Sequence, residues 1–136
     1  MKKALLFAIG LLTLSSAFSQ IIVSGSLDNN SKTVWTNNNI YILQGFVRVT
    51  ANDTLEIQPG TIIKGDFASK GSLIIERDGY LIADGTETSP IVFTSQKPVG
   101  QRAYGDWGGL IICGRASVNQ PANAANGTSQ GEAVVE

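Results

Sequence analysis

The chain has 136 residues and a mass of 14.4 kDa, a length that corresponds to one domain or less. Hydrophobic residues make up 43% and charged residues only 15%, which argues against a disordered chain, and a net charge of −1 without a basic run argues against a nucleic-acid binder. There is no His and a single Cys, Cys113, so Ser-His-Asp triads, Cys-His dyads, zinc sites and internal disulfides are excluded.

The first residues have the pattern of a secretory signal peptide. Lys2 and Lys3 precede an apolar stretch from Ala4 to Ala17, and Ala17-Phe18-Ser19 is a small-x-small cleavage site. The apolar stretch is shorter than the roughly 20 residues that span a bilayer. We therefore expect cleavage between Ser19 and Gln20, no lipid anchor at this end because Gln20 is not Cys, and no transmembrane segment in the mature chain.

Beyond the signal, apolar residues come in strand-length clusters that are rich in β-branched side chains and separated by Gly, Asn, Asp or Pro. No helical spacing persists over three turns, so we expect an all-β protein in which Cys113 is a small buried residue. The clusters are Tyr41-Ile42-Leu43, Phe46-Val47, Ile62-Ile63, Leu73-Ile74-Ile75, Tyr80-Leu81-Ile82, Ile91-Val92-Phe93 and Leu110-Ile111-Ile112.

An internal similarity indicates a solenoid. The segment TLEIQPGTIIKG from Thr54 resembles SLIIERDGYLIADG from Ser72, with Leu55 matching Leu73, and it suggests a repeat of about twenty residues. Strands joined by Gly corners at this spacing predict the coils of a parallel β-helix with Leu55 and Ile57 inward. The alternative is an antiparallel sandwich, but the only Asp-Gly pairs at hairpin-like positions, Asp78-Gly79 and Asp84-Gly85, lie at successive corners of the repeat.

Four strings carry a family resemblance: WTNNNIYILQGFVRV, LEIQPGTIIKGD, GSLIIERDGYLIADGTETSPIVFTS and YGDWGGLIICGRASVNQP. From Trp35 to Pro121 the chain resembles the N-terminal region of secreted, right-handed parallel β-helix (pectin-lyase-like) surface proteins of Bacteroidetes. The resemblance implies further β-helix coils in the same polypeptide and, often, export by the type IX secretion system. It carries no agreed catalytic residues. Asp53-Thr54-Leu55 also fits the short pattern at which these bacteria attach O-glycans to exported proteins.

Acidic residues near the corners are candidates for a glycosidase pair or for calcium ligands, since two carboxylates at about 5 to 9 Å can act as acid and base. Asp beside Gly at a corner is ordinary turn chemistry, and no calcium-loop motif is present. We therefore expect the residues concerned to be turn residues and predict no catalytic, cofactor-binding or metal site. They are Asp66, Glu76, Asp78 and Asp84.

The segment from Tyr104 to Gly109, YGDWGG, is the most distinctive local sequence. Tyr104 and Trp107 could form an aromatic platform for a sugar ring, with Asp106 bonding a hydroxyl. Alternatively, Trp107 closes a coil corner by covering the core, as the glycines beside it permit. The resemblance favours the corner role, and Trp35 is expected to act similarly at the N-terminal cap. Tyr104, Asp106 and Trp107 are the candidate glycan-contact residues.

The sequence thus predicts an all-β, right-handed parallel β-helix of about four coils after a signal peptide. The expected segments are 1–19 signal peptide; 20–40 N-terminal lead and cap, with 25–39 flexible; 41–119 coils; and 120–136 a loop and the start of a further, truncated coil.

The expected function is that of a structural or binding module, adhesin-like or glycan-binding, without catalysis in this segment. It would be secreted or displayed on the outer surface of a Gram-negative bacterium, with cell-surface glycans or proteins as partners, no nucleic acid and no cofactor. The alternative is the N-terminal part of a polysaccharide lyase or glycoside hydrolase whose active site lies beyond Glu136.

Overall fold

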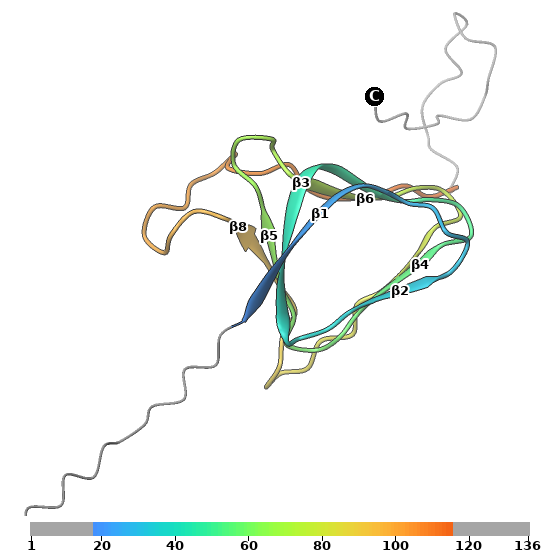
Figure 1. Cartoon of the computed structure of the whole chain (residues 1–136), viewed down its shortest axis with the longest axis horizontal. Coiled ribbons are helices and arrows are strands. Elements are labelled where there is room, and N and C mark those ends of the chain that lie inside the picture. The colour runs from blue at the N-terminus through green and yellow to red at the C-terminus, as the bar shows by residue number, and fades with distance from the viewer. Residues whose placement is uncertain (1–17, 116–136) are drawn as a thin grey trace, which may run out of the picture.

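A computed structural model describes residues 18–115, which form an all-β structure without helices (Figure 1). The chain winds in coils, and every described strand pairs in parallel with a strand of a neighbouring coil, which excludes the antiparallel sandwich. No helix in this part of the chain could cross a membrane. The strands are β1 (Ser19–Leu27), β2 (Lys32–Trp35), β3 (Asn39–Val49), β4 (Thr54–Ile57), β5 (Ile62–Gly65), β6 (Ser72–Ile75), β7 (Tyr80–Ile82), β8 (Val92–Ser95) and β9 (Gly109–Ile112).

The strands stack into three faces around the core, which gives the triangular outline of Figure 1. The first face contains the N-terminal halves of β1 and β3, then β5 and β8; the second contains their C-terminal halves, then β6 and β9; the third contains β2, β4 and β7. β1 and β3 bend between the first two faces at Gly25 and Gly45, whose φ angles of 75° and 66° suit glycine. The expected parallel β-helix is confirmed.

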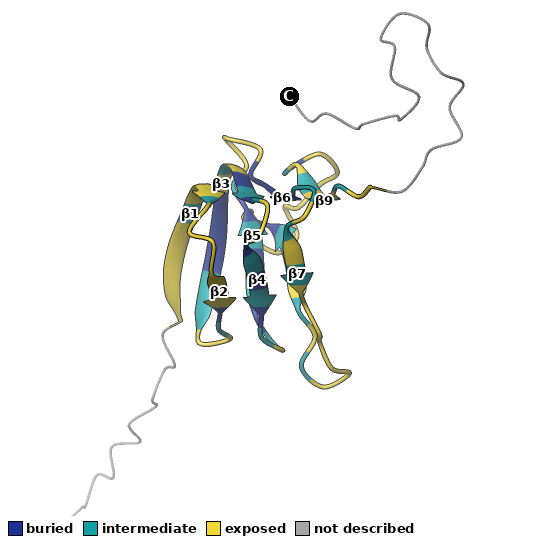
Figure 2. Ribbon diagram, turned by 90° about the vertical axis from the view of Figure 1, so that its right-hand side faces the viewer, coloured by how far each residue is buried: buried dark blue, intermediate teal, exposed yellow. Residues whose placement is uncertain are grey.

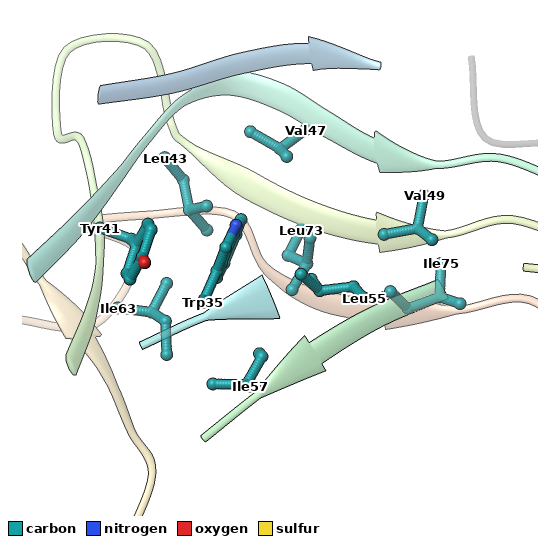
Figure 3. Packing of buried hydrophobic residues seen from close by; sticks show 10 residues of the cluster. All are labelled: Trp35, Tyr41, Leu43, Val47, Val49, Leu55, Ile57, Ile63, Leu73 and Ile75. Atoms are coloured by element: carbon teal, nitrogen blue, oxygen red, sulfur yellow. The ribbon is translucent and has the colours of Figure 1, made fainter. Parts of the chain in front are cut away.

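Side chains alternate between the core and the outside along most strands, and the inward ones form columns from coil to coil, whereas all four residues of β6 are buried. Leu55 and Ile57 are fully buried, as expected from the sequence, and Trp35 stacks on Tyr41 with ring centres 4.7 Å apart. Figure 3 shows these side chains converging from all three faces. The buried cluster comprises Trp35, Tyr41, Leu43, Val47, Val49, Leu55, Ile57, Ile63, Leu73 and Ile75.

The corner between the second and third faces repeats one backbone device. Asn30, Asn52 and Asp78, each two residues before a strand of the third face, have positive φ angles of 47°, 67° and 66°. Asn and Asp adopt this left-handed conformation more readily than other non-glycine residues. The Asn52 amide donates to the Asp78 carbonyl at 2.9 Å, so the corners of successive coils are also hydrogen-bonded.

The corner between the first and second faces differs, because its connection lengthens along the chain. It is a bend at residues 44–46 in the second coil, a loop at 66–71 in the third and a longer loop at 96–108 in the fourth. These two neighbouring loops project from the solenoid in Figure 1. The longer loop, 96–108, contains the three residues of the YGDWGG segment that are candidates for glycan contact.

The structure corrects three expectations from the sequence. Cys113, expected to be buried, is half-buried. Residues 25–39 are not a flexible lead, because they contain the end of β1 and all of β2, which pair with β3 and β4. Leu55 does not stack on Leu73: it pairs with Leu81, whereas Leu73 pairs with Val47. Each of the two similar segments is a strand–corner–strand unit, but the units lie on different faces. The segment from Thr54 contains β4 on the third face and β5 on the first. The segment from Ser72 contains β6 on the second face and β7 on the third.

Burial is greatest in the middle coils and falls toward both ends of the solenoid (Figure 2). Strand β1 at one end and β7 and β9 at the other present largely exposed or half-buried residues. The expected signal segment up to residue 17 and the expected final loop at 120–136 lie outside the described residues, whereas Ser19 and Gln20 begin β1.

Candidate functional site

The three residues singled out in YGDWGG lie in the 96–108 loop, but their side chains have different surroundings. Together with the 66–71 loop, this loop forms a projecting unit, here called the corner cluster, that consists of residues 66–71 and 96–108. Its contacts determine which side chains can meet a ligand.

Trp107 contributes to the core. Its ring is parallel to that of Phe93, with 6.5 Å between ring centres and 4° between planes, and it packs against the buried cluster. It also lies on Gly65, where any Cβ would overlap the Trp107 side chain. This is the corner-closing arrangement that the sequence suggested as an alternative. Trp35 is itself a buried member of the core and stacks on Tyr41, so its expected role as a cap stays a prediction.

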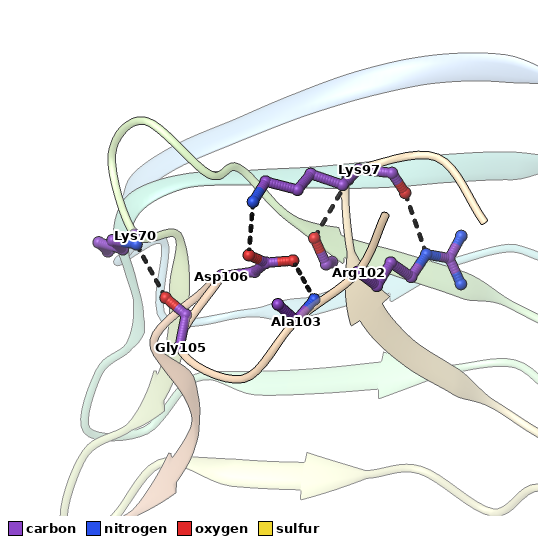
Figure 4. A network of polar contacts seen from close by, with 7 residues as sticks. Lys70, Lys97, Arg102, Ala103, Gly105 and Asp106 are labelled. Atoms are coloured by element: carbon purple, nitrogen blue, oxygen red, sulfur yellow. Dashed lines mark hydrogen bonds and ion pairs between the residues drawn. The ribbon is translucent and has the colours of Figure 1, made fainter. Parts of the chain in front are cut away.

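Asp106 is buried and holds its own loop together. One carboxylate oxygen accepts a hydrogen bond from Lys97 Nζ at 2.8 Å, and the other accepts the Ala103 amide at 2.8 Å (Figure 4). The Lys97 ammonium, helped by the Ala103 amide, lowers the pKa of Asp106 to about 2, so this side chain stays charged. Both of its oxygens already have partners within the loop.

Two lysines join the loops around one aromatic ring. Lys70 Nζ lies 4.3 Å and Lys97 Nζ 3.8 Å from the centre of the Phe67 ring, which is the geometry of cation–π contacts. Lys70 also donates to the Gly105 carbonyl at 2.8 Å, and the Gly108 amide donates to Gly71. The 96–108 loop is therefore fixed to the 66–71 loop at several points.

Tyr104 projects fully into solvent from this fixed loop. The residue after it, Gly105, is the one bound by Lys70, and the nearby Arg102 donates to the Lys97 carbonyl at 3.0 Å. The structure thus separates the three candidates, with Trp107 packed on the core, Asp106 inside the loop and Tyr104 outside. Among them, Tyr104 has the exposure that a ligand contact requires.

Sequence reasoning missed Phe67, Lys70 and Lys97. Lys70 lies in the 66–71 loop and Lys97 in the 96–108 loop, and each loop is longer than the connection at the same corner of the preceding coil. Such a lengthened connection could have indicated residues that project from the solenoid. Their convergence on Phe67 depends on the stacking of coils and could not be found from sequence spacing.

The carboxylates considered for catalysis occupy three corners. Asp66 follows β5, Glu76 and Asp78 both follow β6, and Asp84 follows β7. Asp66 accepts from the Ser69 amide at 2.9 Å, and Glu76 binds Arg48 at 3.1 Å. The Asp66 contact lies within its own turn, whereas the Glu76 contact joins two neighbouring coils, because Arg48 belongs to β3.

Asp78 forms a two-point ion pair with Arg115, through contacts of 2.9 and 2.5 Å. The arginine lowers the pKa of Asp78, and hydrogen bonds from Ser69 lower that of Asp66, which keeps both charged rather than suited to act as acids near neutral pH. Residues 18–115 contain no group of three or more Cys, Asp or Glu side chains that could hold a metal ion.

The Asp53-Thr54-Leu55 pattern has a structural role of its own. Asp53 is buried and accepts the Ser31 amide of the preceding coil at 3.1 Å and the Thr50 hydroxyl at 2.6 Å. Leu55 is in the core, and half-buried Thr54 belongs to the outward set of β4. The O-glycan itself stays a prediction.

Comparison with known proteins supports the solenoid. The family model described as the pectate-lyase-like beta helix domain matches residues 25–134. No curated protein and no solved structure matches the chain.

Proposed function

The chain belongs to the pectate-lyase-like β-helix domain family, and we propose that it is an exported β-helix module that binds glycans through its corner cluster and performs no catalysis within this segment. The observation that carries the proposal is the exposed Tyr104 on a loop held by Lys70, Lys97 and Asp106. Such a module works passively, by presenting side chains on a rigid scaffold.

The arrangement suits binding because the loop backbone that carries the exposed aromatic ring is already fixed. An aromatic ring offers an apolar surface with few rotatable bonds, so contact with one face of a sugar costs little conformational entropy. The hydrogen bond from Lys70 to the Gly105 carbonyl and that from the Ala103 amide to Asp106 fix the backbone on either side of Tyr104. Around it, Lys70 and Arg102 add donors that can meet hydroxyl or acidic groups of a glycan.

The passive role is favoured because the acids have structural partners. Asp106, Asp66, Glu76 and Asp78 each bind a side chain or amide of this chain. The likeness to pectate lyase in the family description favours the second candidate, a polysaccharide lyase or glycoside hydrolase with its catalytic residues beyond Glu136.

Export to the cell surface or medium of a Gram-negative bacterium, by way of a signal peptide cleaved between Ser19 and Gln20, is part of the proposal. Type IX secretion and an origin in Bacteroidetes are included in it on the strength of the sequence resemblance. The N-terminal residue of the protein recovered from surface and medium fractions tests the cleavage. Recovery of an uncleaved chain in the cytoplasm would contradict export.

The binding test is an array of neutral and acidic polysaccharides probed with wild type, Tyr104→Ala and Val99→Ala. Val99 is the matched control because it is also strongly exposed on the same loop. We expect Tyr104→Ala to weaken binding by about tenfold or more, about 1.4 kcal/mol, and Val99→Ala to leave it unchanged. Equal binding by all three proteins would contradict a site at Tyr104, and turnover of any polysaccharide by the native full-length protein would favour the enzyme.

A further inference from the structure

The 96–108 loop contains two turns with the same sequence pattern. Residues 97–100 are KPVG and residues 102–105 are RAYG, so a cation, a Pro or Ala, an apolar side chain and a glycine recur five residues later. Both glycines have a positive φ angle, 85° at Gly100 and 77° at Gly105, and no atom lies within 4 Å of a Cβ placed on either. The shape of the turn, rather than packing, therefore requires glycine at the two positions.

The apolar residue of each pattern lies at the tip of its turn. A hydrogen bond from the amide of the fourth residue to the carbonyl of the first closes the turns 98–101 and 103–106, at 3.1 and 3.3 Å. Val99 and Tyr104 are thus the second residues of their turns, and glycine with positive φ follows each, as in a type II turn. The two side chains are 85% and 107% exposed. The loop therefore presents two apolar side chains on fixed turns.

The two turns are connected to each other and to Phe67. Arg102 Nε donates to the Lys97 carbonyl at 3.0 Å, so the residues that precede the two turns are in contact (Figure 4). Lys97 Nζ lies 3.8 Å from the centre of the Phe67 ring. Lys70 Nζ lies 4.3 Å from the same centre and also donates to the Gly105 carbonyl of the second turn. Phe67 is 45% exposed, so a third exposed apolar side chain belongs to the same fixed unit.

The exposed part of the corner cluster is cationic, although the chain as a whole has a net charge of −1. Lys70 and Arg102 are exposed, and no exposed residue of the cluster is acidic. Of its two carboxylates, Asp106 is buried and Asp66 is half-buried. Exposed apolar side chains beside cations fit an anionic lipid surface, where the apolar groups enter the boundary between headgroups and acyl chains and the cations meet phosphates.

We propose that the corner cluster anchors the protein on an anionic lipid surface, with Val99 and Tyr104 inserted and with Lys70 and Arg102 against the lipid phosphates. Tyrosine suits this boundary because its ring is apolar and its hydroxyl can stay among the headgroups. The proposal goes beyond glycan binding and does not rest on it. Glycan binding is expected to be unaffected by Val99→Ala, whereas lipid insertion uses Val99 as well as Tyr104.

Co-sedimentation of the full chain with vesicles tests the insertion, with phosphatidylcholine alone and mixed with phosphatidylglycerol. We expect the wild type to bind the mixed vesicles, and Val99→Ser and Tyr104→Ser each to lower the partition coefficient about fivefold or more, because each removes an inserted apolar group. Ile22→Ser should bind as the wild type does, since Ile22 is 64% exposed but lies on β1, outside the cluster. Equal binding by all three variants, or no binding by the wild type, would overturn the proposal.

The electrostatic part has its own variants. Arg102→Gln should weaken binding to the mixed vesicles about fivefold, whereas Lys64→Gln, which removes a cation from β5, should change it little. Equal binding of the wild type to both kinds of vesicle would overturn the anionic surface as the partner. Self-association in sedimentation velocity that Val99→Ser abolishes, without vesicle binding, would make a second copy of the chain the occupant.

A measurement of depth separates insertion from attachment by charge alone. The emission of Val99→Trp should shift to shorter wavelength on mixed vesicles and be quenched by lipids brominated on their acyl chains, whereas Ile22→Trp should show neither change. The native Trp35 and Trp107 pack in or against the core and contribute a constant background. Vesicle-bound Val99→Trp without quenching would overturn the insertion of this tip.

Discussion

Trp107 packs against Gly65 and fills the core position that Leu43 fills one coil earlier. Leu43 and Gly65 are paired in β3 and β5, so they belong to the same inward column, and the missing side chain of Gly65 makes room for a ring from the 96–108 loop. Because the Trp107 ring takes the place of an inward side chain at Gly65, the long 96–108 loop can leave the solenoid without uncovering its core. It also explains why the loop containing Tyr104 is fixed at its C-terminal end.

Gly65→Ala should therefore destabilise the protein by about 1 to 3 kcal/mol, the usual cost of overpacking a core. The added methyl meets Trp107 near its own backbone, where a change of rotamer cannot relieve the overlap. Urea unfolding of wild type, Gly65→Ala, Trp107→Gly and the double variant measures the coupling. If Gly65→Ala costs as much in the Trp107→Gly background as in wild type, the contact is not the cause.

The pKa of Asp106 predicts a pH dependence of stability. Its folded value of about 2 lies below the ordinary 3.8, because Lys97 and the Ala103 amide stabilise the carboxylate. Since the pKa is depressed on folding, the contribution is fully present above about 3.8 and is lost as the pH falls toward 2. The stability difference between wild type and Asp106→Asn should shrink over that window. Asp66 and Asp78, whose pKa values are also lowered, are present in both proteins, so their contributions largely cancel in the difference between the two unfolding free energies. Urea unfolding at a series of pH values measures this, and a pH-independent difference would contradict it.

The left-handed corner predicts opposite responses to two small substitutions. Asn52 has a φ of 67°, which a residue with a Cβ adopts at a cost and Gly adopts freely. Asn52→Ala should lose about 1 kcal/mol of stability, whereas Asn52→Gly should stay within a few tenths of wild type. Chemical denaturation of the three proteins gives the comparison. Equal losses in both variants would show that the Asn side chain, rather than the backbone conformation, stabilises the corner.

The strands were predictable from the sequence because their β-branched clusters are short and separated by turn residues. The stacking register was not, since all three faces use the same strand–corner–strand pattern. As a result Leu55 resembled Leu73 in sequence, although it pairs with Leu81. Strands β1 and β2 were not predicted. β2 has only four residues and lies between Asn-rich segments, so its pairing with β4 supplies what its local sequence does not indicate.

The candidate site was only partly predictable for a related reason. The sequence identified the YGDWGG loop, but it could not distinguish the inward Trp107 from the outward Tyr104. That distinction depends on Gly65, about forty residues away in sequence. The convergence of Lys70 and Lys97 on Phe67 likewise requires two neighbouring coils to be stacked.

Lys97 connects the two loops, and its removal should loosen the corner cluster while leaving the coils intact. Lys97→Met keeps an apolar stem beside Phe67 but removes the cation from the ring and from buried Asp106. The Asp106 carboxylate then lacks its closest positive partner, so the Ala103 amide that it accepts should open more often. We expect hydrogen exchange at residues 97–108 to accelerate by at least tenfold, with no change in β4.

Lys64→Met is the matched control, because Lys64 lies in β5 and belongs to its outward set. It removes the same charge without touching the corner cluster. Acceleration in both variants would point to net charge, and acceleration throughout the chain would show that Lys97 stabilises the whole solenoid. Loosening confined to residues 97–108, together with weaker glycan binding, would show that the order of the loop supports the binding surface at Tyr104.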